Sequence, residues 1–351
     1  MLIREGEANI EIPMYKKLCK KMPVFYNPAK EFDRTISVVF LKAFRKIKKK
    51  KLSVLDILAA SGIRGIRLAI EVDGLREVIL NDINPNAFKI MSKNVVKNIS
   101  KLKCPVYLYN LDANAFLFSE KKFFDYIDLD PFGSPIPFLN ACVRFIRRGG
   151  ILAVTATDTA ALCGSKKEAC LRKYDANVKK WECYPEVGIR VLAKAVIKEG
   201  AKFEIALKPV FCHATQHYYR IYFQQDIGAN RVDELIKKIG FYDQMGPLWL
   251  GELFDEKFVE RMYEEALSIN EERLVKFFST IKEEAKIKFP FYLKTSSFGF
   301  EKEPSIKKLI TKLKEYGFTA SRTHFDPKGI KVNTNLAEIK KLMTRLNNKK
   351  I

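Results

Sequence analysis

The segment from Leu52 to Asp158 alternates short apolar runs with stretches of helical spacing, and this alternation limits the fold more than any other feature. The apolar runs suit buried strands. They lie at 52–59, 77–82, 104–113, 123–130 and 149–158, with helical spacing at 62–72, 84–99 and 135–146. Strands that alternate with helices pair in parallel, with helices on both faces and right-handed crossovers. The sequence therefore predicts an open α/β sheet.

Two further runs, at 202–214 and 216–225, have strand character with no helix between them. They are expected to pair antiparallel, and a parallel sheet that ends in one antiparallel hairpin is typical of methyltransferase-type sheets. Beyond Asp226 the chain turns to lysine-rich amphipathic helices. We therefore expect a Rossmann-like class I methyltransferase domain at 1–225 and a smaller basic α/β domain at 226–351. Within the second domain, residues 297–332 read as strand, helix, strand.

Ligands of open α/β sheets bind beyond the carboxyl ends of the strands. The first strand runs into DILAASGIRG, where Gly62 and Gly65 permit a tight turn into a helix. This stretch matches neither the dinucleotide GxGxxG nor the phosphate-loop GxxxxGK[ST] pattern. A glycine turn made only for packing explains it equally well.

The next two strands are each followed by an aspartate. Asp82 follows the second strand, 20 positions after Gly62, where a ribose-binding carboxylate belongs. Asp112 and the Ala113 amide follow the third, where an adenine edge could hydrogen-bond. Each aspartate alone reads as a solvated residue that opens a turn. Together they indicate an adenosyl ligand, and the missing phosphate loop favours S-adenosyl-L-methionine, which has no phosphates.

The fourth strand ends in FFDYIDLDPFGSP, residues 123–135. An amino group on an aromatic base is a poor nucleophile, so it must be held by its N–H bonds before it can accept a methyl group. Asp130 and the Pro131 carbonyl offer two acceptors, and the proline stiffens the loop that carries them. Phe132 offers a face on which a base can stack. An Asp-Pro turn explains the proline without explaining the phenyl ring, so we interpret this strand end as a site for methylating a base amine.

Charge points to the kind of partner. The chain has 63 Lys+Arg against 41 Asp+Glu, a net charge of +22. Such an excess favours a polyanion, and lysine-rich runs such as 45–51 could hold a phosphate backbone. A heat-adapted surface is the alternative, but it usually enriches Glu along with Lys. We therefore expect a nucleic-acid partner.

The seven cysteines are scattered and form no CxxC, and the three histidines are dispersed. This pattern indicates neither a zinc site nor a disulfide framework, so we expect reduced thiols in a cytoplasmic protein that needs no metal. The N-terminus has no apolar signal core, and no apolar run reaches membrane-spanning length. No membrane partner is expected. The oligomeric state is open, and a monomer is favoured.

With these residues in place, the chain resembles the tRNA guanine-26 dimethyltransferase family along nearly its whole length. These class I enzymes put two methyl groups from S-adenosyl-L-methionine onto the exocyclic amine of one guanine. The resemblance is carried by EGEANIEIP, PVFYNPAKEFDRTIS, DILAASGIRGIRLAIE, NDINPNAF, LDAN, DLDPFGSP, VTATDTAALCG, ACLRKYDA, GPLWLGEL and SRTHFDPKGIK. The combination of DPFGSP with SRTHFDP is highly specific.

The resemblance implies roles for particular residues. The cofactor contacts would be Arg34, Arg64, Gly62, Asp82, Asp112 and Ala113. Asp130, with Pro131, would orient and deprotonate the amine, and Phe25 and Phe132 would sandwich the guanine. Arg34 and Phe25 follow from the family alone; without it they read as a surface charge and a core aromatic.

The chain departs from the family pattern at one point. Many relatives carry a four-cysteine zinc module before GPLWLG, whereas residues 226–245 here contain no cysteine. We expect the zinc site to be absent and apolar packing of Leu235, Ile236, Ile239 and Phe241 to hold this connection.

The predicted function is therefore methylation of the 2-amino group of guanine 26 in tRNA, first to mono- and then to dimethylguanosine. The target base is stacked in folded tRNA, so it must be extruded. One alternative is an amino-group methyltransferase that acts on rRNA or DNA. Another is a catalytically degenerate RNA-binding protein, which the three strand-end aspartates disfavour. A dehydrogenase is a more distant alternative, because SGIRG lacks the dinucleotide spacing.

Overall fold

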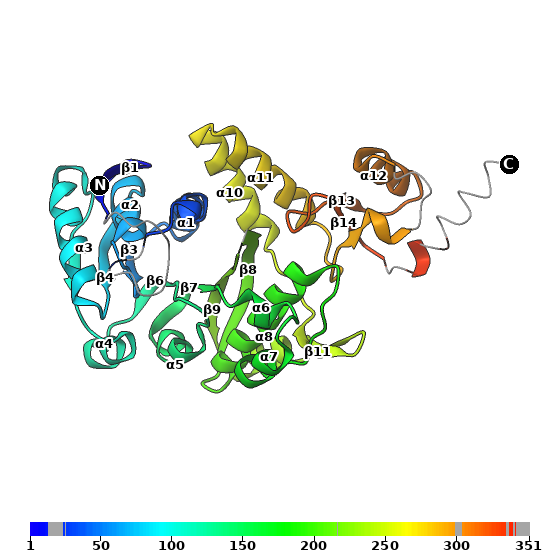
Figure 1. The fold of residues 1–351 in the computed structure, drawn as a ribbon, viewed down its shortest axis with the longest axis horizontal. Coiled ribbons are helices and arrows are strands. Elements are labelled where there is room, and N and C mark those ends of the chain that lie inside the picture. The colour runs from blue at the N-terminus through cyan, green and yellow to red at the C-terminus, as the bar shows by residue number, and fades with distance from the viewer. Residues whose placement is uncertain are drawn as a thin grey trace. The chain divides into compact units, whose positions relative to one another are not determined.

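A seven-stranded sheet forms the centre of the fold (Figure 1). The computed structural model describes residues 1–12, 24, 26–215, 217–298, 304–334, 337–339 and 341. The strands are β3 (Leu52–Asp56), β4 (Leu75–Asn81), β5 (Val106–Tyr109), β6 (Phe124–Leu129), β7 (Ile146–Ala156), β8 (Ile205–Thr215) and β9 (Tyr218–Ile227). Their order in the sheet is β5-β4-β3-β6-β7-β9-β8.

The direction of the strands agrees with the prediction. The pairs β3–β4, β3–β6, β4–β5 and β6–β7 are parallel. β9 begins three residues after β8 ends, which is too short for a crossover, so these two neighbours run antiparallel. The predicted parallel sheet with one antiparallel hairpin is confirmed.

Helices cover both faces of this sheet. They are α1 (Glu31–Lys48), α2 (Ile63–Glu71), α3 (Pro85–Lys97), α4 (Ala113–Glu120) and α5 (Ile136–Phe145). The helices α1, α2 and α3 pack side by side, and α4 packs on α5 on the opposite side of the sheet (Figure 1). Every residue of β3 and β6 is therefore buried, whereas the edge strand β5 is partly exposed.

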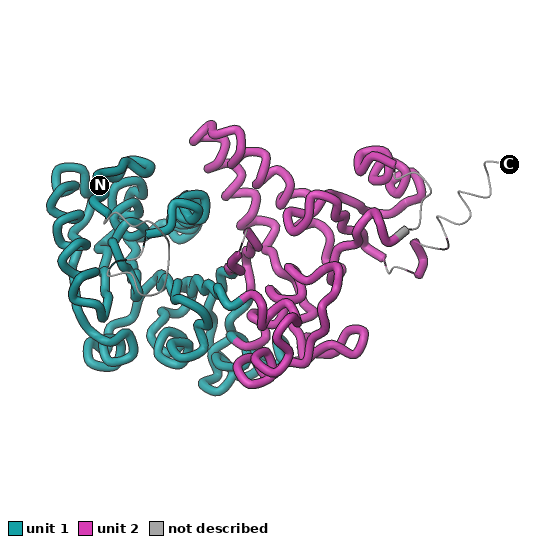
Figure 2. The backbone as a smooth tube through the Cα atoms, in the orientation of Figure 1, with its two compact units in different colours: residues 1–158, 196–208, 221–236 teal, residues 159–195, 209–220, 237–351 magenta. Residues whose placement is uncertain are grey.

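The chain divides into two compact units, each assembled from separate segments (Figure 2). Unit 1 comprises residues 1–158, 196–208 and 221–236, and unit 2 comprises 159–195, 209–220 and 237–351. Three elements, α8 (Tyr184–Ala201), β8 and β9, contribute residues to both units. The compact units thus interleave along the chain. The functional division into a catalytic domain at 1–225 and a tRNA-binding domain at 226–351 stays a prediction.

Unit 1 also contains a short N-terminal hairpin that the apolar pattern did not indicate. Its strands are β1 (Leu2–Glu5) and β2 (Ala8–Glu11). Two asparagine side chains, Asn94 of α3 and Asn98 directly after it, bond the backbone of β2. Asn98 accepts from the Asn9 N–H at 2.9 Å and donates to its carbonyl at 2.7 Å, and Asn94 does the same for Glu11 at 2.7 and 3.1 Å. The amide side chains thus make the hydrogen bonds to β2 that a neighbouring strand would otherwise make.

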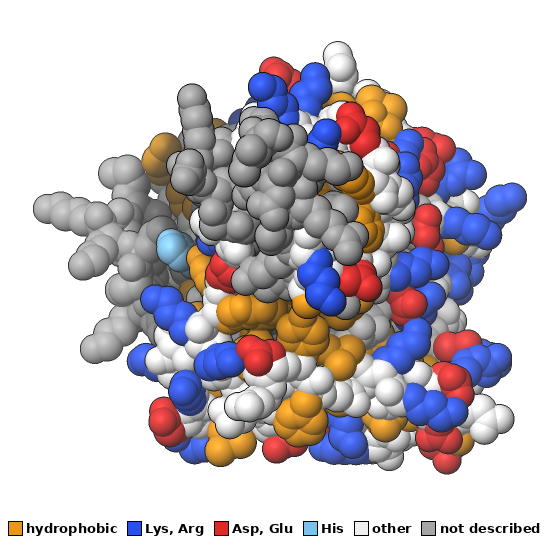
Figure 3. Space-filling view, turned by 90° about the vertical axis from the view of Figure 1, so that its right-hand side faces the viewer, with side chains coloured by type: hydrophobic (Ala, Val, Ile, Leu, Met, Phe, Trp, Pro, Cys, Tyr) orange, Lys and Arg blue, Asp and Glu red, His pale blue; other side chains and the backbone are white. Residues whose placement is uncertain are grey.

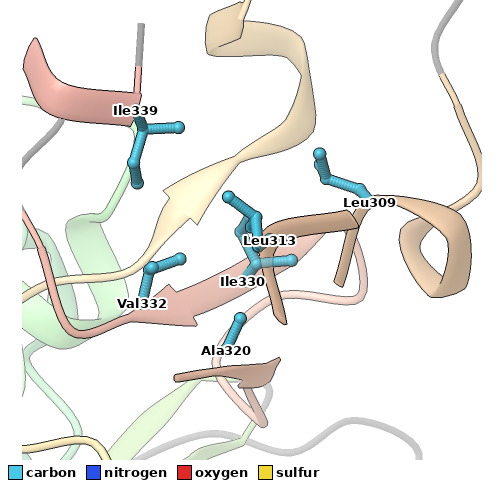
Figure 4. Packing of buried hydrophobic residues seen from close by; sticks show 6 residues of the cluster. All are labelled: Leu309, Leu313, Ala320, Ile330, Val332 and Ile339. Carbon is cyan, nitrogen blue, oxygen red and sulfur yellow. The ribbon is translucent and has the colours of Figure 1, made fainter. Parts of the chain in front are cut away.

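Unit 2 is built from short helices and small sheets. Its elements include α6 (Thr159–Leu162), α7 (Lys167–Tyr174), β10 (Ile239–Tyr242), β11 (Met245–Trp249), α10 (Glu256–Ile269), α11 (Glu272–Glu284), β12 (Leu293–Lys294), α12 (Ile306–Glu315), β13 (Ala320–Arg322) and β14 (Gly329–Val332). An antiparallel sheet of order β12-β14-β13 packs against α12. Leu309 and Leu313 of α12 lie with Ile330 and Val332 of β14 in its core (Figure 4).

The expectation for residues 297–332 is partly wrong. The helix and a following strand are present as α12 and β13. The first expected strand is not found at its start, because Thr295–Phe298 form a 3-10 helix, and residues 299–303 lie outside the described part. A further strand, β14, completes the small sheet.

The cysteine-free connection forms the helix α9 (Ala229–Ile236) and the hairpin β10–β11. Leu235 is buried, and Ile236 and Ile239 are half-buried. Phe241 is 68% exposed, so the expectation that it packs here is wrong. In the described residues, no helix has the length and apolar character needed to cross a membrane.

Candidate functional site

The turn that follows β3 begins the site. Gly62 caps α2 in the left-handed region, with a φ of +78°. A Cβ at this position would also lie 2.9 Å from Cγ of Met91. Both the turn conformation and the close packing therefore require glycine.

Asp82, at the end of β4, ties two loops together. Its Oδ2 accepts from the Ala60 N–H at 2.8 Å, and its Oδ1 accepts from the Asn84 N–H at 2.9 Å. Burial raises the pKa of Asp82 above its ordinary value of 3.8, against the opposing effect of these two bonds. The side chain is thus held at the strand end by the backbone of the neighbouring turn.

The ends of β3, β4 and β5 are joined through one buried amide. Asn81 donates to the carbonyls of Ile57 at 3.1 Å and Leu111 at 3.0 Å. Beyond Leu111, Asp112 is exposed and caps α4 by accepting from the N–H groups of the second and third residues after it. Ala113 is buried at the first position of the same helix. The structure therefore brings the predicted residues Gly62, Asp82, Asp112 and Ala113 to one edge of the sheet.

Two exposed apolar side chains lie at this edge and were not predicted as site residues. Ile83 directly follows Asp82 and is 59% exposed, and Leu111 directly precedes Asp112 and is 41% exposed. Apolar side chains that remain exposed beside polar strand ends are suited to the flat face of a base. Their place next to the acidic residues is the signal in the sequence that could have identified them.

Asp130 lies at the end of β6, where Arg64 of α2 binds it. Nη2 of Arg64 is 2.6 Å from Oδ2 of Asp130 and 2.7 Å from Oδ2 of Asp33, and Nη1 donates to Oγ of Ser37 at 2.6 Å. The side chain of Arg64 is 6% exposed. Arg64 therefore connects the end of β6 to two polar residues of α1.

A second cation holds the other oxygen of the same carboxylate. Lys30 donates to Oδ1 of Asp130 at 2.5 Å, and its side chain is only 10% exposed. Asp128 lies two residues earlier on β6, 3.5 Å from Nε of Arg64. The carboxylates of Asp33, Asp128 and Asp130 thus gather around the guanidinium of Arg64. Carboxylates at a strand end suit a positively charged ligand.

The loop after β6 is clamped to the end of β7. Pro131 is buried, and Phe132 is 49% exposed. Gly133 has a φ of +83°, donates to Oγ1 of Thr157 at 2.6 Å and accepts from the Thr157 N–H at 2.9 Å. Among the described residues, a Cβ on Gly133 would meet nothing within 4 Å. The loop therefore holds a half-exposed phenyl ring next to a glycine that these residues do not crowd.

Arg34 belongs to a different network from Arg64. Its guanidinium makes two bonds to the carboxylate of Glu5, at 2.6 and 2.5 Å, and a third to the Asn27 carbonyl at 3.2 Å. Burial raises the pKa of Glu5, but the bonds to Arg34 and the charges of Arg34 and Arg67 outweigh burial and hold it below 4.5. Arg34 thus joins α1 to β1. The cofactor contacts of Arg34 and Arg64 stay predictions.

Other predicted residues lie elsewhere. Asp125, at the start of β6, accepts from the Ser53 N–H and pairs with Lys50 and Arg147, so it does not share the site of Asp130. Phe25 lies outside the described residues. Its predicted place against the guanine stays a prediction.

Lys30, Asp33, Ser37 and Thr157 were not predicted from the sequence. The first three precede or lie on α1. The sequence argument considered only residues that follow strands, and α1 comes before the first parallel strand. Asp33 and Ser37 are four residues apart, which puts both on one helix face. Polar residues at helical spacing within an otherwise buried helix are the signal that could have identified them.

Most thiols of the described residues are buried. Six cysteines are free, and five of them are buried. Burial raises the pKa of Cys142 to about 12 and that of Cys104 to about 11, which keeps both protonated. In the part of the chain that the structure describes, no group of three or more His, Cys, Asp or Glu side chains could hold a metal.

The sheet order and the residues at its strand ends define a class I, S-adenosylmethionine-dependent methyltransferase. Within this class, the family model for N2,N2-dimethylguanosine tRNA methyltransferases matches residues 6–244 and 241–344. The chain belongs to that family.

Individual relatives cover the whole chain. It is 39% identical to the tRNA (guanine(26)-N(2))-dimethyltransferase of Methanocaldococcus jannaschii, over 97% of each chain. It is 36% identical to the enzyme of the same name from Pyrococcus horikoshii, over 94% of each chain. The solved complex of Trm1 from Pyrococcus horikoshii with S-adenosyl-L-methionine superposes with a TM-score of 0.88 at 34% identity, covering 98% of this chain and 99% of that chain.

Proposed function

We propose that this chain transfers methyl groups from S-adenosyl-L-methionine to the exocyclic 2-amino group of guanine 26 in tRNA, giving mono- and then dimethylguanosine. The observation that carries this proposal is the carboxylate of Asp130, bound by Arg64 and Lys30 next to the exposed ring of Phe132. The relatives named above are tRNA enzymes, which favours tRNA over rRNA or DNA.

The residues at the sheet edge fit the cofactor. Asp82 would accept from the ribose hydroxyls, and Asp112 with the Ala113 amide would bind the adenine edge beside the apolar Ile83. The carboxylates at the end of β6 suit a sulfonium. When bound, S-adenosyl-L-methionine supplies an electrophilic methyl group on its sulfur.

The protein's own residues would prepare the amine. Asp130 and the Pro131 carbonyl accept its two N–H bonds, which aims the nitrogen lone pair at the methyl group. Asp130 then takes the proton that the alkylated nitrogen must lose. Phe132 stacks on the extruded guanine, and the Thr157 clamp on Gly133 keeps the loop in place. The monomethylated amine has one N–H left, which Asp130 would accept and deprotonate when the second methyl group is transferred.

We further propose that residues 226–351 bind the body of the tRNA and that the chain works in the cytoplasm. The net charge of +22 supports binding to tRNA. The free thiols at the six described cysteines support the cytoplasmic location. Activity without a metal and a monomeric state stay predictions.

Mass spectrometry of nucleosides tests this proposal. Purified protein and S-adenosyl-L-methionine are incubated with an unmodified tRNA transcript and with a transcript that has adenine in place of guanine 26. We expect mono- and dimethylguanosine from the first transcript alone, and neither from duplex DNA nor from an rRNA fragment. Equal methylation of both transcripts would disprove the position, and methylation of DNA or rRNA alone would disprove the substrate.

A further inference from the structure

Unit 2 contains a hollow of about 440 Å³ between α11, α12 and β13. Its lining is mostly polar. Three cations, Lys307, Lys314 and Arg322, and three hydroxyl side chains, Thr280, Thr311 and Ser321, are among the residues that form it. Lys and Arg side chains are spread widely over the face shown in Figure 3, among acidic and apolar ones. Positive charge alone therefore does not mark a site in this protein, but a hollow that gathers cations and hydroxyls does.

The helix α12 presents one polar face to this hollow. Lys307, Thr311 and Lys314 are spaced by four and three residues, which puts them in one row along the helix. Leu309 and Leu313 point the other way, into the small core (Figure 4). Packing of the apolar face of α12 against the small core thus fixes the direction in which its polar face points. At 1.5 Å per residue, the two lysines start about 10 Å apart along the axis, a spacing that allows each to contact a different phosphate of one backbone.

The strand β13 holds Arg322 in place through its neighbours. Glu284 of α11 is fully buried, and its two oxygens accept from Oγ1 of Thr323 at 2.7 Å and from the His324 N–H at 2.9 Å. The ring nitrogen Nδ1 of His324 lies 2.7 Å from the same carboxylate. Arg322 is also paired with Ile330 of β14. The backbone that carries the third cation is therefore anchored on both sides.

The part of the chain that the structure describes does not pair the cations of the hollow with carboxylates. Among the described residues, no ion pair involves Lys307, Lys314 or Arg322. The one carboxylate in the lining, Glu283, pairs with Lys286 at 2.7 Å. The hollow thus keeps a positive surplus and several hydroxyl donors.

We propose that this hollow binds two successive phosphates of an RNA backbone, away from the methylated base; the choice of tRNA as that RNA rests on the proposed function. Lys and Arg supply the charge that phosphate contacts need, and Ser and Thr hydroxyls commonly donate to phosphate oxygens. The site contributes affinity for the substrate and takes no part in the chemistry.

Two double variants of the same helix test this inference. Lys307→Ala with Lys314→Ala removes two charges from the hollow, and Lys308→Ala with Lys312→Ala removes two exposed charges that do not line it. Binding of labelled tRNA is measured without cofactor over a series of salt concentrations. For the first pair, the slope of log K against log salt should become shallower by about 1.4 to 1.8, at roughly 0.7 to 0.9 per lost phosphate contact. The matched pair should keep nearly the wild-type slope.

Steady-state methylation gives a second readout. The first pair should raise KM for tRNA and leave kcat and the affinity for S-adenosyl-L-methionine unchanged, and Arg322→Ala should act in the same direction. If both double variants weaken tRNA binding equally, the effect comes from general surface charge and the inference is overturned. Unchanged tRNA binding in the variant without Lys307 and Lys314 would also overturn it, and would mean that the hollow binds a different partner. A third outcome is that the first double variant loses tRNA binding while the wild-type protein does not methylate tRNA. This result would overturn the proposed function but support the RNA-binding site.

Discussion

At the scale of single residues, the carboxylate of Asp130 is held by a cation on each oxygen. Lys30 binds Oδ1, and Nη2 of Arg64 binds Oδ2. Each carboxylate oxygen has two lone pairs, so an amine N–H can still be accepted beside these two donors. The pair of cations therefore orients the carboxylate and favours its ionised form without blocking it.

Replacement of Lys30 tests this orienting role. In Lys30→Met one charge-assisted hydrogen bond to Asp130 is lost while most of the buried volume remains. Such bonds contribute about 1.5–3 kcal/mol, so kcat should fall by at least about tenfold. KM for tRNA should change little, because Lys30 is not proposed to contact the RNA. Lys30→Arg should restore most of kcat, and a Lys30→Met enzyme with kcat within twofold of wild type would remove Lys30 from the account.

At the scale of elements, the strands of the central sheet were predictable and the small hairpins were not. The strands β3 and β6 are buried on both faces, so they appear in the sequence as short, largely apolar runs that lead into acidic residues. The four-residue strands β1 and β2 have no such run. The strand β2 is held by Asn94 of α3 and by Asn98, which directly follows α3. Both asparagines are distant in sequence, so no local pattern indicates the hairpin.

The same distinction holds within the site. Asp82, Asp112 and Asp130 could be predicted because strand order brings the carboxyl ends of parallel strands to one edge. Lys30 and Thr157 could not, because their roles depend on contacts with Asp130 and Gly133 that only the folded chain creates.

The hairpin β1–β2 is also joined to two helices by charge, which gives a stability prediction. Glu5 is buried and binds Arg34 of α1 and Arg67 of α2. In Glu5→Gln, Arg34 loses its buried counter-charge, and Arg67 keeps only its pair with Glu71. Breaking a buried pair typically costs about 3–5 kcal/mol, so the free energy of unfolding at pH 7 should fall by roughly that amount.

The pH dependence of this loss follows from the direction of the shift. The pKa of Glu5 in the folded protein lies below its ordinary value of 4.5. A lowered pKa stabilises the fold above pH 4.5, and this contribution is lost as pH falls from 4.5 through the folded-state pKa. The difference between wild type and Glu5→Gln should therefore shrink below pH 4.5 in urea unfolding. A difference that stays constant from pH 7 to pH 3.5 would show that the charge of Glu5 is not what stabilises the hairpin.

At the scale of the whole molecule, the two compact units interleave along the chain. We therefore expect that truncation cannot separate the proposed catalytic function from the proposed tRNA binding. The buried Oε1 of Glu186 accepts from Arg190, from Lys331 at 2.7 Å and from the Phe291 N–H at 2.8 Å. Two of these partners lie more than a hundred residues further along the chain. A cut near residue 226 would thus leave Glu186 buried without most of its partners.

The fragment 1–226 is therefore expected to be destabilised rather than to fold as an independent catalytic domain. It should melt at a clearly lower temperature than the full chain, and proteolysis should cut it first within 159–195, the segment that loses its partners in unit 2. Circular dichroism melts and limited proteolysis measure both effects. A fragment that melts with the full chain and resists cleavage at 159–195 would show that the segment does not depend on residues 237–351.

The central claim is that the end of β6 prepares a guanine amine for methyl transfer, and Asp130→Asn tests it most directly. The amide keeps the shape of the side chain but is too weak a base to take the proton from the alkylated nitrogen. General-base catalysis is typically worth about two to four orders of magnitude, so single-turnover methylation of tRNA should slow by at least about a hundredfold. The melting temperature serves as the control for folding, and the affinity for S-adenosyl-L-methionine serves as the control for the proposed cofactor contacts of Asp82 and Asp112. A folded, cofactor-binding Asp130→Asn enzyme that methylates tRNA at nearly the wild-type rate would contradict this account.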